Sequence, residues 1–349
     1  MSRVVVVGAT GNVGTSVLQA LAHERAVDSV LGIARRLPEL ELPKVEWAQA
    51  DVASSDLVPL FRGADCVVHL AWLIQPSRDR NRLWLTNVHG SARVFSAVAG
   101  ARVPALVYAS SVGAYSPGPK HRRVDESWPT NGVRTSFYGR QKAEVEWLLD
   151  AFERDRPETR IVRLRPGLIF KREAASGIRR LFAGPFLPSR LVRPGLIPFV
   201  PDIPRLRFQG VHSLDVGEAY RLAIVGEARG AFNIAAEPVL DPPELARLLG
   251  ARLVTVPPRL ARAFAAATWR LHLQPTPPGW LDLALAVPLL DVSRAREELG
   301  WGPRYSSGEA LLELMGGIRD RAGAATPPLD PGTGGPARVR ELATGVGSR

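Results

Sequence analysis

The sequence predicts an α/β protein with a doubly wound parallel sheet and a smaller, mostly helical C-terminal lobe. Short, wholly apolar runs alternate with helical patterns as far as about residue 170. A glycine-rich turn follows the first apolar run, and prolines and glycines become frequent after Arg165. Wholly apolar strands separated by helices indicate a parallel sheet that is covered on both faces, with right-handed crossovers.

The alternating pattern assigns most elements of the first half of the chain. The expected strands are Arg3–Val7, Ser29–Ala34, Val45–Ala48, Cys66–Leu70, Ala105–Ala109 and Arg160–Arg165. The expected helices are Gly14–Ala22, Asp56–Phe61, Asn87–Gly100 and Phe137–Phe152. Prolines and glycines in 166–208 indicate irregular structure, and Ser306 with Glu309 resembles a capping box that starts a late helix.

Composition excludes several classes of protein. The 349 residues are 46% hydrophobic, enough for a large core, and the net charge is +11. Arginines are scattered rather than clustered with aromatic residues, so we expect no nucleic-acid partner. No apolar run reaches the roughly 20 residues that cross a bilayer, so we expect no integral membrane association. The single cysteine, Cys66, and a strand that starts at Arg3 favour a reducing, cytoplasmic setting without a signal peptide or a metal site.

Gly8, Gly11 and Gly14 stand between the first strand and the first helix. A strand, tight turn and helix aim unpaired N–H groups and a positive helix dipole at one point, where an anion fits. The spacing differs from G-x-G-x-x-G, and an ordinary glycine-rich turn is the alternative. Its position at the start of a βαβ pattern favours dinucleotide binding in a Rossmann-type fold.

The end of the second strand indicates which dinucleotide is bound. Arg35 and Arg36 stand where an NAD-specific protein would place a carboxylate, and guanidinium groups suit a 2′-phosphate. We therefore expect NADP as the preferred cofactor, with NAD as the alternative. Asp51, after the third strand, could accept a hydrogen bond from the adenine amino group, or serve as a helix N-terminal acid near Ser54 and Ser55.

A tyrosine and a lysine supply candidate chemistry. Tyr138 and Lys142 are four residues apart in a helical pattern, so their side chains leave the same face. A nearby ammonium lowers the pKa of a phenol, as general acid–base work requires. The alternative is a tyrosine that merely packs beside a lysine. Ser110 and Ser111 follow an apolar strand, where a hydroxyl could donate to a substrate carbonyl or could cap a turn.

Taken in order, the motifs resemble those of an extended short-chain dehydrogenase/reductase of the NAD-dependent epimerase/dehydratase family. The resemblance covers residues 3 to about 318. The motifs are GATGNVG, ADV, DCVVHLA, TNVHGS, YASS, YGRQK, RPGLIF, HSLDV, FNIA and DVSRAREELGWGPR.

The resemblance implies roles for individual residues. Ser111 would polarise the carbonyl, Tyr138 would exchange the proton, and Lys142 would bind the nicotinamide ribose and lower the tyrosine pKa. Asn87 would steady the central helix and a proton-relay water. The implied cofactor-binding set is Gly8, Thr10, Gly11, Asn12, Val13, Gly14, Arg35, Arg36, Asp51, Val52, Leu70, Ala71, Tyr138, Lys142, Pro166 and Leu168. A homodimer through the helices that hold Asn87 and Tyr138 is also implied.

The same resemblance divides the chain. Residues 1–167, with a return segment at about 208–236, would form the dinucleotide-binding domain. Residues 168–207 and 237–320 would form the substrate-binding lobe, and 321–349 a disordered tail rich in polar residues and chain breakers.

Departures from the family pattern bear on the substrate. Leu168 stands where nucleotide-sugar enzymes commonly have an asparagine, and Trp72 replaces a small residue. With Ser111 they form the expected substrate-contacting set. We expect an oxidoreductase that interconverts a secondary alcohol and a ketone on a fairly apolar small molecule. The alternatives are a nucleotide-sugar epimerase/dehydratase with tightly held NAD and a non-catalytic NADP-binding sensor.

Two further features have simpler interpretations. His69 and His212 are expected to be core or backbone-anchoring residues rather than metal ligands. Residues 259–273 form a basic amphipathic pattern that could lie on a membrane surface. An ordinary surface helix with its apolar face turned inward is the favoured alternative.

Overall fold

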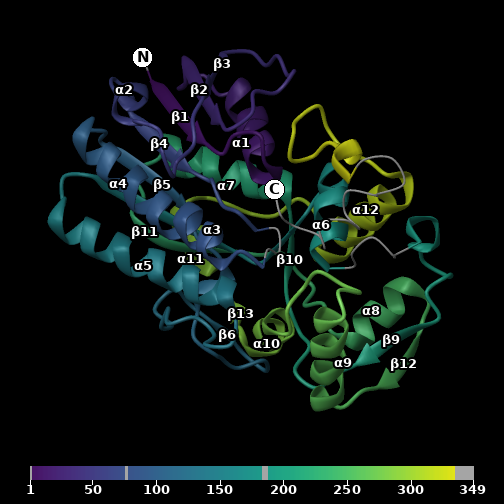
Figure 1. Ribbon diagram of the computed structural model, residues 1–349. Coiled ribbons are helices and arrows are strands. Elements are labelled where there is room, and N and C mark those ends of the chain that lie inside the picture. Colours follow the sequence, from purple (N-terminus) through teal and green to yellow (C-terminus); the bar gives the residue numbers. More distant parts are fainter. Residues whose placement is uncertain (1, 75–77, 183–187, 335–349) are drawn as a thin grey trace.

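A computed structural model describes residues 2–74, 78–182 and 188–334 (Figure 1). Its centre is a seven-stranded parallel sheet, which confirms the predicted fold class. In spatial order the strands are β11 (Gly230–Ile234), β7 (Arg160–Pro166), β5 (Ala105–Ala109), β4 (Cys66–His69), β1 (Arg3–Val7), β2 (Ser29–Ala34) and β3 (Val45–Gln49). The six strands assigned from the sequence, which are β1 to β5 and β7, agree with the prediction to within one residue at each end.

Helices cover both faces of the sheet, each with its own apolar cluster. One cluster joins the sheet to α1 (Asn12–Ala22), α7 (Ser213–Val225) and α11 (Ser293–Glu298). The other joins it to α2 (Val58–Phe61), α4 (Gly90–Gly100) and α5 (Phe137–Asp155). Because both faces are covered, the strands can be apolar throughout, as the sequence pattern requires.

The strand register brings the turns that carry the candidate catalytic and cofactor-binding residues to one edge of the sheet. Val7 is paired with Ile33 on one side and with His69 on the other, and His69 is paired with Tyr108. The carboxyl ends of these neighbouring strands therefore lie level. The turns that follow them open onto the same edge, where doubly wound sheets bind their ligands.

A smaller lobe lies beside this edge, and Figure 1 shows part of it, with α8, α9, β9 and β12, at the lower right. Its helices are α6 (Ala175–Phe182), α8 (Pro242–Leu249), α9 (Pro258–Arg270), α10 (Gly279–Ala286) and α12 (Ser307–Asp320). Three two-stranded parallel sheets pair β8 (Leu168–Phe170) with β10 (Gly210–His212), β9 (Phe199–Asp202) with β12 (Arg252–Thr255), and β6 (Arg123–Val124) with β13 (Leu289–Leu290). The capping box of Ser306 and Glu309 is present at the start of α12, as predicted.

The remaining short elements connect these layers. They are α3 (Arg80–Trp84), a π-helical turn (Leu85–His89) and 3₁₀ turns at Val112–Ala114, Arg172–Ala174, Ser189–Leu191 and Pro331–Gly334. The helix that the sequence predicts from Asn87 therefore begins as a π-helical turn and continues as α4. Within the described ranges, none of the helices combines the length and apolar character needed to cross a bilayer.

Two segments differ from their sequence-based expectation. No residue of α9 is fully buried, and its large side chains Leu260 and Phe264 are exposed, whereas the favoured interpretation placed the apolar face inward. The composition of residues 321–334 predicts part of a disordered tail, yet Thr326 and Leu329 are buried against the rest of the chain. Residues 335–349 of that expected tail lie outside the described residues.

Candidate active site

The glycine turn combines tight packing with one open position. Gly8 has φ +87°, and a Cβ added there would lie 2.6 Å from the backbone nitrogen of Ala71. A Cβ at Gly14 would lie 2.5 Å from the carbonyl oxygen of Ala9. A Cβ at Gly11 would meet only the Gly8 carbonyl oxygen, at 3.5 Å. Packing of the strand against the helix therefore requires Gly8 and Gly14, whereas Gly11 leaves the start of α1 open to a ligand.

The start of α1 fits an anion. Its N-cap is Gly11, no side chain of the described residues caps the helix, and no acidic residue stands in its first turn. The first N–H groups of the helix are therefore free of side-chain partners and carry the positive end of the dipole. These residues suit the pyrophosphate of a dinucleotide.

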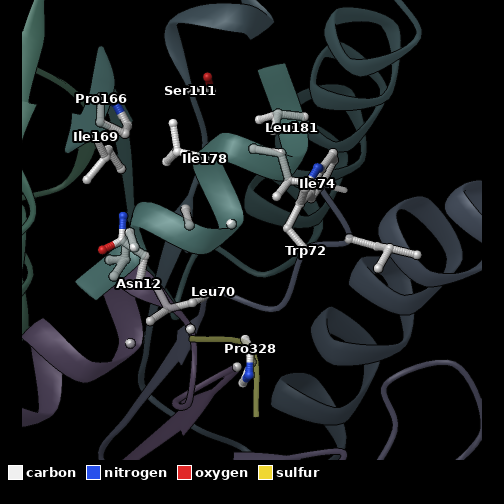
Figure 2. A pocket seen from close by; sticks show the side chains of 18 of the residues that line it. Asn12, Leu70, Trp72, Ile74, Ser111, Pro166, Ile169, Ile178, Leu181 and Pro328 are labelled. Atoms are coloured by element: carbon white, nitrogen blue, oxygen red, sulfur yellow. The ribbon is translucent and has the colours of Figure 1, made fainter. Parts of the chain in front are cut away.

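A cavity of about 1090 Å³ runs from this turn into the smaller lobe. Figure 2 shows Asn12 and Leu70, Ile178 of α6, and Pro328 around this space. The predicted site residues that line it are Gly8, Thr10, Gly11, Asn12, Val13, Gly14, Arg35, Arg36, Val52, Leu70, Ala71, Trp72, Ser111, Tyr138, Lys142, Pro166 and Leu168. The structure thus brings together in one cavity almost all of the residues that the sequence singles out.

Asp51 and Asn87 are the two exceptions. One carboxylate oxygen of Asp51 accepts a hydrogen bond from the Ala53 N–H at 2.9 Å. Asp51 is not part of the cavity wall, although its neighbour Val52 is, and α2 begins only at Val58, so Asp51 holds a turn and is not a helix N-terminal acid; the adenine contact stays a prediction. Asn87 is buried behind the wall: it accepts from the Leu73 N–H at 2.7 Å and donates to the Gln141 side-chain oxygen at 2.9 Å.

Tyr138 and Lys142 project from the first turns of α5 into the cavity beside Ser111. The helix begins at the cap Ser136, whose hydroxyl accepts from the Gly139 N–H at 3.2 Å. The Tyr138 ring packs so closely on Gly113 that a Cβ there would lie 2.6 Å from the ring. The absence of a side chain at Gly113 therefore leaves room for the phenol beside the serine.

The electrostatics of this group follow from burial. Burial raises the pKa of Tyr138 to about 12, and a hydrogen bond with Ser111 opposes the rise. Burial lowers the pKa of Lys142 to about 7, against the attraction of Glu146. The Lys142 ammonium donates to the Ala109 carbonyl oxygen at 2.7 Å. Without a ligand the phenol is neutral near pH 7, whereas the lysine can gain or lose its proton there.

Aromatic rings surround the tyrosine and lysine. The Lys142 nitrogen lies 3.5 Å from the centroid of a Trp72 ring, a cation–π contact. The Trp72 and Tyr138 rings meet edge to face at 6.0 Å between centroids. Trp280 of α10 stacks on Tyr138 at 4.9 Å and 30°. The proton-transferring pair therefore sits in an apolar, aromatic part of the cavity.

A buried ion network ties α5 to the central strands. Glu146 is fully buried and accepts from Arg165 at 2.8 and 2.9 Å and from Arg163 at 3.3 Å. Its carboxylate also accepts from the Ser110 hydroxyl. These four groups come from α5, β7 and the turn after β5, so the helix that carries Tyr138 is anchored to the sheet by charge-assisted hydrogen bonds.

Several lining residues could not be found from the sequence. The C-terminal segment is one case: the Thr326 hydroxyl donates to the Thr10 carbonyl oxygen at 2.9 Å. Pro327, Pro328 and Leu329 then form part of the wall next to the glycine turn. A polar, proline-rich composition signals a tail, and nothing local in it indicates this contact.

The sequence predicts that one end of the cavity is apolar, but it does not identify the residues that line this end. The wall there includes Ile178, Leu181 and Phe182 of α6 and Trp280 and Leu283 of α10. The apolar stretch WLDLALAVPLL pointed to α10, but no pattern distinguished Trp280, which stacks on the tyrosine, from its neighbours.

The histidines have the structural roles that were expected. His69 is buried, bonds to the Ser91 hydroxyl at 2.9 Å, and has its pKa lowered by burial to about 3. His212 is buried in the smaller lobe, where its ring stacks on Tyr305. Among the described residues, no group of three or more histidines, cysteines or carboxylates could hold a metal ion.

The doubly wound fold and the cavity that joins a tyrosine, a lysine and a serine to a glycine turn define an extended short-chain dehydrogenase/reductase. The sequence profile described as the NAD dependent epimerase/dehydratase family matches residues 4–177. The chain belongs to this family.

Curated relatives are similar over different parts of their length. An uncharacterized protein of Mycobacterium tuberculosis (strain ATCC 25618 / H37Rv) is 28% identical over 328 residues, which is 92% of this chain and 30% of that protein. The chain therefore spans less than a third of the length of the first relatives that it matches. A 2-alkyl-3-oxoalkanoate reductase of Shewanella oneidensis is 31% identical over 177 residues, 49% of this chain and 45% of that protein.

Solved structures share the fold over nearly the whole chain. A UDP-glucuronic acid 4-epimerase from Bacillus cereus in complex with NAD has a TM-score of 0.66 at 17% identity, covering 91% of this chain and 99% of that one. A UDP-glucose 4-epimerase of Thermus thermophilus in complex with NAD has a TM-score of 0.64 at 21% identity, with the same coverage. At these identities the likeness concerns the fold.

Proposed function

We propose that this chain is an NADP-preferring oxidoreductase that interconverts a secondary alcohol and a ketone on a fairly apolar small molecule. The observation that carries the proposal is the position of Tyr138. Its ring lies between Trp72 and Trp280, beside Ser111, in a cavity that also reaches the glycine turn. A carbonyl compound in the apolar end of the cavity would meet both a proton donor and a hydride carrier.

In the reducing direction, the nicotinamide supplies a hydride to the carbonyl carbon when it is bound. The Tyr138 hydroxyl gives its proton to the carbonyl oxygen, so that an alcohol forms, and the Ser111 hydroxyl donates a hydrogen bond to the same oxygen as charge develops. Charged Lys142 stabilises the resulting phenolate and lowers the pKa of Tyr138 from its raised value. In the oxidising direction the phenolate removes the proton from the alcohol.

The wall of the cavity supports an apolar substrate. Leu168 lines it at the position where nucleotide-sugar enzymes commonly have an asparagine, and Leu181, Leu283 and Trp280 add apolar surface. The name of the Shewanella relative describes the reduction of a 3-oxo group on a molecule with an alkyl substituent. Such a molecule is a fairly apolar carbonyl compound. 2-Alkyl-3-oxoalkanoates are therefore the first substrates to assay.

A direct test is Tyr138→Phe, with Tyr305→Phe as the matched control because Tyr305 lies outside the cavity wall. We expect Tyr138→Phe to bind NADPH normally and to lose about 10²- to 10⁴-fold in kcat, the usual contribution of a general acid. The control should keep full activity. Unchanged turnover in Tyr138→Phe would remove the phenol from the mechanism, and absence of turnover in the wild type across carbonyl substrates would favour the non-catalytic sensor.

Cofactor preference is tested at the end of β2. Arg35 and Arg36 are exposed and line the cavity, so their guanidinium groups can reach a 2′-phosphate. Losing one charge-assisted hydrogen bond and adding a repelling carboxylate in Arg35→Asp should lower the preference for NADPH over NADH by about 10- to 100-fold. The charge-matched control is Arg25→Asp, outside the wall. An unchanged ratio of kcat/KM values in Arg35→Asp would refute the 2′-phosphate assignment.

A nucleotide-sugar epimerase is the second candidate, because several solved structures with this fold are complexes with a UDP-sugar and NAD. The two functions differ in how they use the cofactor. An epimerase regenerates its NAD in each cycle and would carry it through purification, whereas the proposed reductase consumes added NADPH. Mass spectrometry of the native protein and NADPH consumption with each substrate class separate them.

We also propose a cytoplasmic homodimer that associates through α4 and α5. Analytical ultracentrifugation of the wild type and of Trp147→Ser tests the dimer, because Trp147 is an exposed apolar side chain on α5.

A further inference from the structure

Helix α9 presents a row of large apolar side chains to solvent. Leu260, Phe264 and Leu271, with the small Ala267 between them, follow the spacing of four, three and four residues that places side chains on one face of a helix. Leu260 is 64% exposed, Phe264 72% and Leu271, just past the end of the helix, 67%. We call these three large side chains the α9 stripe.

Contacts on the opposite face fix this orientation. Arg262 forms a two-pronged ion pair with Asp282 of α10, at 2.8 and 3.1 Å. Near the other end of the helix, Arg78 donates to the Trp269 carbonyl oxygen at 2.6 Å, and its guanidinium lies 4.5 Å from the centroid of that tryptophan ring. The helix is therefore held at both ends with its polar contacts inward and the α9 stripe outward.

The surroundings of the stripe are cationic. Five arginines and no carboxylate stand in the sequence between Glu244 and Asp282. Three of these arginines are exposed and have no ion-pair partner among the described residues: Arg252 on β12, and Arg259 and Arg270 on α9. On the helix, Arg259 and Arg270 lie along one flank of the stripe. Leu253 and Val254 of β12 add exposed apolar surface to the same lobe.

An outward apolar stripe beside unpaired arginines fits one kind of partner. An anionic lipid bilayer offers apolar chains below a layer of phosphates, and amphipathic helices with basic flanks lie at that boundary. A second copy of this chain fits less well, because a symmetric contact through this face would bring arginines together with no carboxylate in the segment to neutralise them.

We propose that α9 docks this protein on the surface of an anionic membrane, with Leu260, Phe264 and Leu271 inserted at the headgroup boundary. The docked helix leads directly to the apolar end of the cavity. The segment after α9 is tied to α6 by a hydrogen bond from the Thr276 hydroxyl to the Leu181 carbonyl, and Leu181 and Trp280 line the cavity. An apolar substrate dissolved in the bilayer would thus be close to its binding site, a consequence that rests on the proposed function, whereas docking itself does not.

Vesicle flotation with the full chain tests the proposal. The probes are vesicles of phosphatidylcholine alone and of phosphatidylcholine with phosphatidylserine. We expect binding to the anionic vesicles only, weakened by high salt. Phe264→Ser should lower the partition coefficient by roughly tenfold, from the lost burial of one aromatic side chain. Arg259→Gln and Arg270→Gln should each lower it by about fivefold, since a basic residue near an anionic surface contributes about 1 kcal/mol.

The control variant is Val225→Ser, which removes an exposed apolar side chain at the end of α7 on the other lobe. It should bind like the wild type, and all variants should keep the thermal midpoint of the wild type because the changed side chains are exposed. The proposal is overturned if the wild type does not float with anionic vesicles, or if Phe264→Ser and Val225→Ser bind equally well. It is also overturned if ultracentrifugation shows a dimer that Phe264→Ser dissociates, which would assign the stripe to a second copy.

Discussion

Trp72 should control the charge on Lys142, and hence the pH at which Tyr138 works. The ammonium lies 3.5 Å from the tryptophan ring centroid, and Lys142 is only 3% exposed. A desolvated cation–π contact contributes about 2 kcal/mol. Because one pKa unit corresponds to about 1.36 kcal/mol, Trp72→Leu should lower the pKa of Lys142, already near 7, by roughly 1.5 units. At neutral pH the lysine would then be mostly uncharged.

The consequence should appear in the pH profile of alcohol oxidation. This direction requires the phenolate of Tyr138, and an uncharged Lys142 no longer stabilises it, so the pKa of the phenol stays near its raised value of about 12. We expect the rising limb of kcat/KM to move to higher pH by about one unit or more in Trp72→Leu. Trp72→Phe, which keeps an aromatic face, should move it less.

The experiment compares kcat/KM between pH 6 and pH 10 for the wild type and both variants on the same alcohol. Since the phenol and the amine titrate as a pair, the limb reports the pair and not either group alone. A loss of activity that is equal at every pH would mean that Trp72 only shapes the cavity. If the rising limb of the pH profile lies at the same pH in Trp72→Leu as in the wild type, the electrostatic argument is refuted.

Two further predictions concern stability and are checked by differential scanning calorimetry. The pKa of Lys142 is lowered from 10.5 to about 7, so its charge destabilises the folded state fully below pH 7, and this penalty fades as the pH rises toward 10.5. Lys142→Met should therefore raise the Tm at pH 6 but leave it nearly unchanged near pH 10; an equal rise at both would contradict this. Glu146→Gln leaves Arg165 buried without its carboxylate, whereas Arg163 keeps Asp150 and Glu153, and we expect a cost of about 3 to 5 kcal/mol. For a chain of this size that lowers the Tm by roughly 4 to 7 °C, and a shift below 1 °C would show that the network is replaceable.

Local patterns made the sheet and the chemistry predictable. The strand β1, its glycine turn and the pair of Tyr138 and Lys142 depend on the identity and spacing of neighbouring residues. The structure brings them to one cavity because the carboxyl ends of parallel strands lie at one edge. This part of the site follows from residues that are close in sequence.

Contacts between distant segments could not be predicted in this way. Glu146 meets Arg165 across 19 residues, and Thr326 meets Thr10 across 316. Each of these side chains is unremarkable in its own segment. Asp51 illustrates a different limit: its side chain bonds a backbone N–H within a turn, which neither of the two sequence interpretations described.

The orientation of α9 shows why an amphipathic pattern is ambiguous. The pattern states that one face is apolar, and burial of that face is the usual outcome. Here the Arg262–Asp282 ion pair and the Arg78–Trp269 contact hold the polar side inward. Which face meets the rest of the protein is decided by partners outside the helix, so periodicity alone did not predict that Leu260 and Phe264 are exposed.

The bond between Thr326 and Thr10 also constrains the order in which the nucleotide pocket can form during synthesis. The glycine turn emerges from the ribosome first, but the part of its surroundings made by Pro327, Pro328 and Leu329 is translated more than 300 residues later. A nascent chain can pair its early strands, yet its pocket stays incomplete until this late segment arrives. The pocket therefore becomes complete only after Pro327, Pro328 and Leu329 are translated, although its most recognisable motif is translated more than 300 residues earlier.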